Sequence, residues 1–244
     1  AFDGAGEWIP LTSDRKSYVP GFSVEEVLVH TRLAADTVRP TKMDRPEDIE
    51  PNPVTGTVYC SLTNNTKRTA EQVDEANPRA ANKHGQVLEI SERGNDPTAT
   101  RFAWTLLIVA GDPTKPDTYY GGYDTSQVSP MSAPDNVAFD PSGHLWVTTD
   151  GNELGFHDGL YAVPTRGRER GHARLFMTVP EGAEATGPVL TADGLTALLA
   201  VQHPGEAEGS TAENPASTFP YGGRPRPTVV VVWRTGPGSP RIGA

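Results

Sequence analysis

The chain has 244 residues and a formal net charge of -10, and this acidic balance argues against non-specific nucleic-acid binding, which needs clustered Lys and Arg opposite the phosphates. Its 25 glycines and 23 prolines, with only 36% hydrophobic residues, favour many turns and short strands over a bundle of long helices. The single cysteine, Cys60, excludes an internal disulfide, and no apolar run approaches the roughly 18 residues of a membrane span.

The N-terminal region contains one strand-like pattern. The first residues, AFDGAGEW, include neither Met nor a signal-like apolar core, which is typical of a processed or truncated N-terminus. The segment EEVLVHTRL at 25–33 is predicted as an outer strand. A charged stretch, MDRPEDIE, then leads directly into the first clear hairpin.

Three later segments share a strand–turn–strand pattern. Their turns are NPVTG at 52–56, DPSG at 140–143 and TADG at 191–194, and each supplies residues that tight hairpins need. Apolar residues alternate on both sides of each turn, as expected for half-buried strands. The three hairpins are therefore predicted as copies of one structural unit.

Each of the first two hairpins is followed by two more strand patterns. They lie at 85–91 and 101–111 after the first hairpin, and at 159–165 and 173–179 after the second. Four-stranded units that recur every ~40 to 50 residues describe the blades of an all-β propeller. We therefore expect an all-β fold of the β-propeller type.

The visible blades form a partial set. Polar loops at 63–85 and 112–132 are inserted between the first and second hairpins, and TVVVVW at 228–233 is predicted as a buried strand with Trp233 in the core. Propellers usually need at least four blades to close their ring. Residues 1–244 are accordingly predicted as a single β-propeller domain or a C-terminal fragment of one.

Superposing the three turns places acidic residues at equivalent positions. Glu47 then matches Asp135, Asp48 matches Asn136, and Glu184 lies on the same side of the third repeat by strand parity. The first strand of each propeller blade lines the central channel, so Glu47, Asp135 and Glu184 should converge there. Carboxylates that face one another repel, and a cation between them relieves this.

The ligand types define which cation fits. Carboxylates, the Asn136 amide and backbone carbonyls suit calcium or magnesium, and a hard ferric iron also accepts them. The six histidines show no paired spacing of the kind that zinc sites use. Arg45, beside this cluster, either neutralises the carboxylates or holds a substrate phosphate or carboxylate in its planar fork. The spacing leaves these readings of Arg45 open.

Several ordered motifs carry a family resemblance. MDRPEDIEPNPVTGTVYCSLTNN, NPRAANKHGQVLEI, APDNVAFDPSGHLWVTTDG, EATGP and QHPGE together resemble the C-terminal part of PhoX-type alkaline phosphatases, from about residue 25 to the end. The resemblance implies a six-bladed β-propeller, exported by the twin-arginine route to the periplasm or beyond. It also implies hydrolysis of phosphorylated small molecules with a calcium and iron cluster at the channel mouth.

The resemblance also assigns roles to individual residues. Through the DRPE motif it implies that Arg45 is the catalytic, phosphate-contacting residue. The other implied roles are metal ligation by Glu47, Asp135 and Glu184, substrate binding by Asn136 and Asn82, and support of the site by Asp44 and His203.

The chain also departs from the family pattern. The N-terminal portion that supplies an iron-binding cysteine and further acidic ligands in the family has no counterpart here, and Cys60 is expected to be a packed core thiol. That missing portion is therefore a candidate partner of this chain.

Two other functions remain open at this point. The first is a calcium-dependent propeller hydrolase of the lactonase type, in which one axial calcium polarises a carbonyl and no phosphate-binding arginine is needed. The second is a non-catalytic propeller fragment or subunit that keeps the fold for binding.

Overall fold

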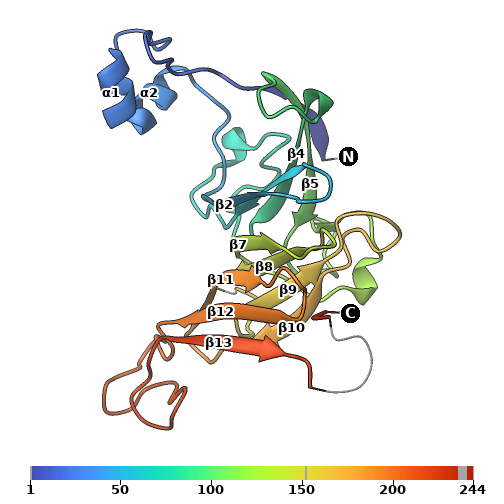
Figure 1. Ribbon diagram of the computed structural model, residues 1–244. Helices are drawn as coiled ribbons and strands as arrows, with labels where there is room; N and C mark the ends of the chain where they lie inside the picture. The colour runs from blue at the N-terminus through green and yellow to red at the C-terminus, as the bar shows by residue number, and fades with distance from the viewer. Residues whose placement is uncertain (1, 152, 236–240, 244) are drawn as a thin grey trace.

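The chain folds into antiparallel sheets that are stacked one on the next (Figure 1). This computed structural model describes residues 2–151, 153–235 and 241–243. Its helical elements are α1 (Val24–Val29), α2 (Thr31–Thr37), η1 (Ala70–Gln72), η2 (Arg93–Asn95) and η3 (Thr125–Gln127). Its strands are β1 (Asp3–Glu7), β2 (Pro46–Pro51), β3 (Val58–Leu62), β4 (Gln86–Glu92), β5 (Arg101–Val109), β6 (Tyr119–Tyr120), β7 (Pro134–Phe139), β8 (Leu145–Thr149), β9 (Gly159–Val163), β10 (Arg174–Thr178), β11 (Glu184–Leu190), β12 (Thr196–Gln202) and β13 (Thr228–Trp233).

The predicted repeat is confirmed. The hairpins β2–β3, β7–β8 and β11–β12 form at the three predicted turns, and each opens one sheet of the described chain. The sheet orders are β1-β5-β4-β3-β2 with β6 on β5, then β10-β9-β8-β7, then β11-β12-β13. The first strand of every hairpin carries a register irregularity, between its first and fourth residues in β2 and β7 and in the middle of β11, so the three units share a local distortion as well as a topology.

The first sheet contains a strand that the sequence patterns did not predict. β1 pairs with β5, and its DGAGE sequence lacks the apolar alternation of a strand. The glycines are required by their neighbours, because a side chain on Gly4 would lie 2.8 Å from the ring of Trp104 and one on Gly6 would collide with Phe102. The large β5 side chains thus occupy the space beside β1.

The outer strand predicted at 25–33 is wrong, because this segment forms α1 and α2. Ser23 starts α1 with a capping box, in which its hydroxyl accepts from Glu26 N at 3.2 Å and its own N–H donates to the Glu26 carboxylate at 2.8 Å. This local signal outweighs the strand propensity of the valines. The two helices bury Val27 and Ala34 in a small cluster and stand apart from the sheets (Figure 1).

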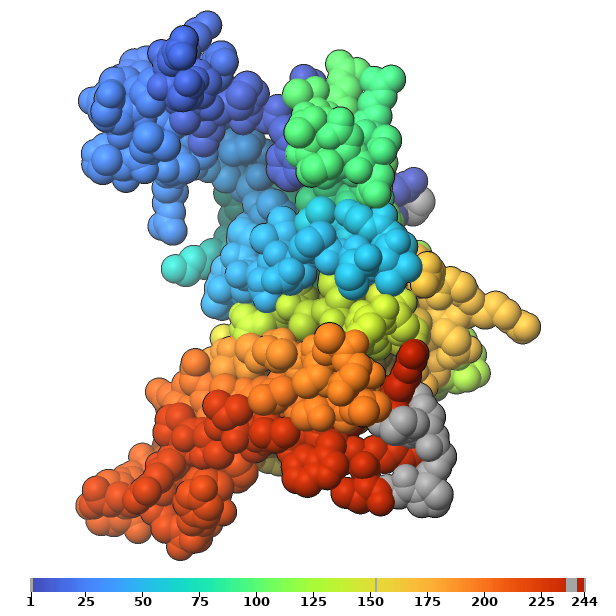
Figure 2. Space-filling view, in the orientation of Figure 1, coloured from blue at the N-terminus to red at the C-terminus, as the bar shows by residue number. Residues whose placement is uncertain are grey.

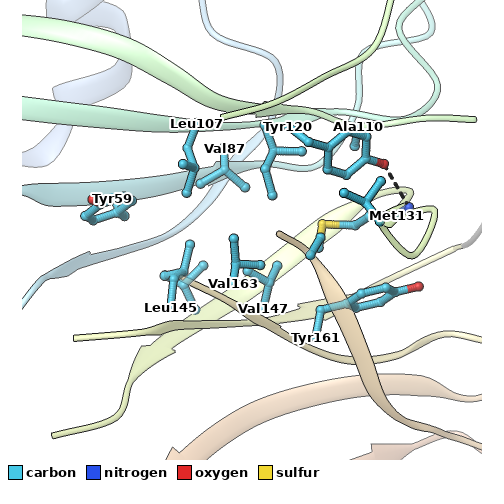
Figure 3. Packing of buried hydrophobic residues seen from close by; sticks show 14 residues of the cluster. Tyr59, Val87, Leu107, Ala110, Tyr120, Met131, Leu145, Val147, Tyr161 and Val163 are labelled. Carbon is cyan, nitrogen blue, oxygen red and sulfur yellow. Dashed lines mark hydrogen bonds between the residues drawn. The ribbon is translucent and has the colours of Figure 1, made fainter. Parts of the chain in front are cut away.

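The main core lies between the first and second sheets (Figure 3). Val87 and Leu107 from the first sheet face Leu145 and Val163 from the second. The second and third sheets share another core, built around Trp146, Leu160, Ala185, Leu199 and Val201. Burial of these side chains supplies the main driving force that stacks the sheets.

Cys60 is a core thiol, as predicted. It is buried beside Leu62, Leu88 and Leu106 in a third apolar cluster of the first sheet. Burial, with a smaller effect of the Asp48 charge, raises the pKa of the thiol to about 11. Its place in the core therefore agrees with a packing role.

The prediction that β13 is a buried strand with Trp233 in the core is wrong. Val229, Val231 and Trp233 are 64%, 47% and 61% exposed, whereas the intervening residues are half-buried. β13 pairs only with β12 in the described chain, and it ends the third sheet. One face of this edge strand packs on the core while the other is open, which an unbroken run of valines cannot reveal.

Candidate active site

The first strands of the three hairpins lie side by side in the order β2, β7, β11 (Figure 1). The side chains of Asp48 and Asn136 join them. The Asp48 carboxylate accepts from Val137 N at 2.9 Å, and the Asn136 amide oxygen accepts from Gly187 N at 2.8 Å. The equivalence of Asp48 and Asn136 is therefore reflected in the structure, where each links its sheet to the next.

Asp135 lies in β7, the middle one of these three strands. It is 6% exposed, and its backbone oxygen accepts a hydrogen bond from the Ser61 hydroxyl of the first sheet. Burial, followed by the charges of Glu184, Asp150 and Glu47, raises the pKa of Asp135 to about 7, while Arg45 opposes the shift. Glu184 and Glu47 thus both lie within electrostatic range of Asp135, and the ligand roles of the three residues remain predictions.

Arg45 is half-exposed beside this group, with its side chain 51% exposed. Its Nη2 lies 2.9 Å from Glu47 Oε1 and its Nη1 donates to Asn64 Oδ1 at 3.2 Å. The backbone at Arg45 has a φ of 44°, an unusual value for a residue other than glycine. The guanidinium is therefore held by acceptors on two sides, and only two of its five N–H donors are used in these contacts.

Glu184 and His203 meet on the third sheet. Glu184 Oε2 accepts from Gln202 Nε2 at 2.6 Å and lies 3.3 Å from His203 Nε2, while His203 Nδ1 lies 3.1 Å from Glu206 Oε2. Burial and then the Asp150 charge raise the pKa of Glu184. Burial lowers the pKa of His203, but the Gly182 carbonyl and the carboxylates of Glu206 and Glu184 raise it above its ordinary value.

A cavity of about 770 Å³ borders Glu184. Its lining includes Asp150, Asp158, His203 and Glu206, and sequence reasoning missed the two aspartates. A signal for Asp150 existed, because it follows the second strand of a hairpin whose first strand contains Asp135. Pro134 pairs with Thr149, so the carboxylates that follow these two residues reach the same end of the sheet.

Asp44 and Asn82 lie inside the protein. Asp44 is fully buried and forms an ion pair with Arg68 at 2.6 Å, and Asn82 Nδ2 donates to its other carboxylate oxygen at 2.9 Å. The Asn82 amide also contacts Gln86 and the N–H of Gly85. This placement suits the predicted supporting role of Asp44, while substrate binding by Asn82 stays a prediction.

The donor chemistry of the site fits a hard cation, since Glu47, Asp135 and Glu184 offer carboxylate oxygens, and burial followed by neighbouring negative charges raises the pKa of Asp135. Within residues 2–151, 153–235 and 241–243, however, no three His, Cys, Asp or Glu side chains come together as a metal-binding group.

A protein-family model described as alkaline phosphatase PhoX matches residues 1–205. The chain belongs to the PhoX alkaline phosphatase family. The PhoX match includes the first residues, which the sequence motifs did not cover, and it ends before β13.

Two solved structures provide further comparisons. PhoX from Pseudomonas fluorescens, solved in complex with vanadate, a transition state analogue, is 36% identical with a TM-score of 0.78. That match covers 95% of this chain and 41% of the other, so this chain spans less than half the length of that PhoX. A gluconolactonase from Xanthomonas campestris is 15% identical over a match that covers 70% of this chain and 57% of the gluconolactonase chain. Its TM-score of 0.32 is too low to support a conclusion about fold or function. No curated protein matches the chain.

Proposed function

We propose that this chain is part of a metal-dependent phosphomonoesterase in which Arg45 binds the phosphoryl oxygens of a phosphorylated small molecule. The observation that carries this proposal is the half-exposed Arg45 guanidinium, which is held by Glu47 and Asn64 and lies near enough to Asp135 to lower its pKa. A planar guanidinium pairs well with phosphate oxygens. Membership of the PhoX family and the vanadate complex of a similar PhoX support the same chemistry.

Arg45 and the carboxylates would have separate tasks. Arg45 would orient the phosphoryl group and compensate the charge that develops on its oxygens. Glu47, Asp135 and Glu184 would hold calcium and iron, with Asn136 next to them. When bound, these cations supply Lewis-acid stabilisation of the phosphoryl oxygens. His203 would orient Glu184, which it contacts at 3.3 Å.

The site would be completed by parts of a longer PhoX-type propeller. Two observations support this: the described residues contain no complete metal-binding group, and the third sheet leaves an apolar face with Val229 and Val231 exposed. A further blade would cover that face and add ligands. Export through the twin-arginine route to the periplasm or beyond is part of this proposal. No helix among the described residues has the length and apolar character needed to cross a membrane.

Replacing Arg45 tests the proposed function. In the full-length protein, Arg45→Ala should lower kcat/KM for an aryl phosphate by about 10²- to 10³-fold, because a preorganised transition-state contact is lost. Arg45→Lys is the matched control: it keeps the charge but loses the fork, so part of the activity should return. Undiminished phosphate hydrolysis in Arg45→Ala, or lactone hydrolysis that is independent of Arg45, would overturn the proposal.

A further inference from the structure

Arg68 is a buried arginine in the loop between β3 and β4, and sequence reasoning did not single it out. It is 5% exposed. Its Nε donates to Asp44 Oδ1 at 2.6 Å, and its two terminal nitrogens donate to the backbone oxygens of Gln72 at 2.5 Å and Lys42 at 2.7 Å. The guanidinium therefore connects this loop to the segment that enters β2.

The Asp44 carboxylate is held on both of its oxygens. Arg68 binds one and Asn82 Nδ2 binds the other at 2.9 Å, and Asp44 is fully buried. The next residue, Arg45, has a φ of 44°. Such a backbone conformation costs energy in a residue with a side chain and persists where the surroundings impose it. Asp44, fixed by two partners, is a direct source of that constraint.

The same loop also supplies the acceptor for the Arg45 side chain. Asn64 Oδ1 receives the hydrogen bond from Arg45 Nη1 at 3.2 Å. The backbone N–H of Arg68 donates to the backbone carbonyl of Asn65 at 3.2 Å, and the backbone N–H of Asn65 donates to the backbone carbonyl of Asn82 at 2.7 Å. These two bonds belong to the backbone and hold the loop that carries Asn64, whereas the Arg68 side chain acts on Arg45 through Asp44.

A buried ion pair is a poor source of net stability, because desolvation of both charges offsets most of their attraction. It does fix geometry, since an arginine fork bound to three oxygens permits one arrangement. In Asp44 and Arg68 this geometry is imposed directly beside the guanidinium assigned to phosphate.

We propose that Arg68 is a positioning residue for phosphate binding: its ion pair with Asp44 holds Arg45 in the orientation that grips the phosphoryl group. This inference rests on the proposed function of Arg45. Arg68 itself, buried behind Asp44, does not touch the substrate.

A double-mutant cycle with Arg45 tests the inference in the full-length protein, with orthovanadate as the probe. Arg68→Lys keeps the charge next to Asp44 but loses the fork, and it should weaken vanadate binding about tenfold. In an Arg45→Ala background, the same change should have no further effect, because Arg68 acts through Arg45. Equal weakening in both backgrounds, or no weakening in either, overturns the proposal.

Arg170→Lys is the matched control. Arg170, in the loop between β9 and β10, forms an ion pair with the buried Glu89 of β4, and neither residue contacts Arg45 in the hydrogen bonds and ion pairs described above. Loss of its fork should leave vanadate affinity unchanged. If Arg68→Lys does not fold, the neutral pair Asp44→Asn with Arg68→Gln replaces it in the cycle, because it leaves no unpaired buried charge.

Backbone amide hydrogen exchange separates failure of this inference from failure of the proposed function. If the unaltered protein does not bind vanadate, the assignment of Arg45 to phosphate fails. Faster exchange at the amides of residues 44, 45, 47 and 48 in Arg68→Lys, relative to Arg170→Lys, would still support positioning of Arg45 by Arg68. Unchanged exchange there overturns it whatever the activity.

Discussion

At the scale of single residues, the site depends on how Arg45 is held. Its guanidinium lies between Glu47, two residues along the chain, and Asn64, from the end of the neighbouring strand. Phosphate binding by an arginine fork is directional, so acceptors that fix its plane should affect affinity. Asn is a common turn residue, so the sequence gives no sign that Asn64 contacts Arg45. The contact follows from the path of the loop after β3.

Removing the Asn64 acceptor should weaken phosphate binding. Asn64→Ala deletes the hydrogen bond at Arg45 Nη1, and we expect KM for an aryl phosphate to rise about fivefold, the equivalent of one ordinary hydrogen bond. Asn65→Ala is the control, because the Asn65 side chain binds Lys67 N instead. Steady-state kinetics on the full-length protein measure both. Equal effects of the two substitutions would contradict an orienting role for Asn64.

At the scale of elements, the side-chain links between first strands align the sheets. The Asp48 carboxylate is the acceptor for Val137 N across the first interface. Asp48→Ala leaves that N–H without its partner and should lower the free energy of unfolding by about 1–3 kcal/mol. Asp48→Asn retains an oxygen acceptor and should stay close to the original stability. Urea unfolding distinguishes them, and identical losses would show that the charge of Asp48, not its hydrogen bond, stabilises the interface.

The second hairpin turn should make stability depend on pH. Asp140 accepts from the backbone N–H groups of Ser142 and His144 and from the Ser142 hydroxyl. Burial alone would raise its pKa, but hydrogen bonds from His144 and Ser142 hold the pKa of Asp140 well below its ordinary value. A lowered pKa in the folded state contributes stability that is complete above about pH 4 and is lost as the pH falls through the folded-state value.

Asp140→Asn should therefore reduce the free energy of unfolding by about 1–3 kcal/mol at pH 7, and its difference from the unaltered protein should shrink below about pH 4. Asp193→Asn is the control, since Asp193 caps the third turn from an exposed position and should have a smaller effect. Thermal unfolding across pH 2.5 to 7 measures the difference. A difference that stays constant over this range would rule out Asp140 ionisation as the cause.

At the scale of the whole molecule, local turn chemistry predicted the repeated hairpins, because Pro, Asp and Gly act within a few residues. The repeat also predicts that Glu47, Asp135 and Glu184 face one axis, which stays a prediction, although the charges of Glu47 and Glu184 both act on Asp135. The pairing of β1 depends instead on rings in β5 that lie about a hundred residues away in sequence, and the burial of Arg68 depends on the return of a long loop. Such features follow from tertiary packing, which a single-sequence pattern does not contain.

The stack of sheets ends in an open apolar face. Figure 2 shows the sheets as successive bands along the molecule, with the third sheet in orange and red at one end. Val231 pairs with Leu198 of β12, and its side chain is 47% exposed. In the longer propeller that we propose, a further blade would cover this residue.

Val231→Lys in the full-length protein tests that arrangement. If another blade packs on β13, the substitution buries an unpaired charge and should lower the free energy of unfolding by about 3 kcal/mol or more. If the face is open to water, the change should stay within about 0.5 kcal/mol, as for most surface substitutions. Val73→Lys is the control, because Val73 is 39% exposed in the loop between β3 and β4. Equal tolerance of lysine at both positions would mean that no blade covers β13, and the remaining metal ligands would then have to come from elsewhere.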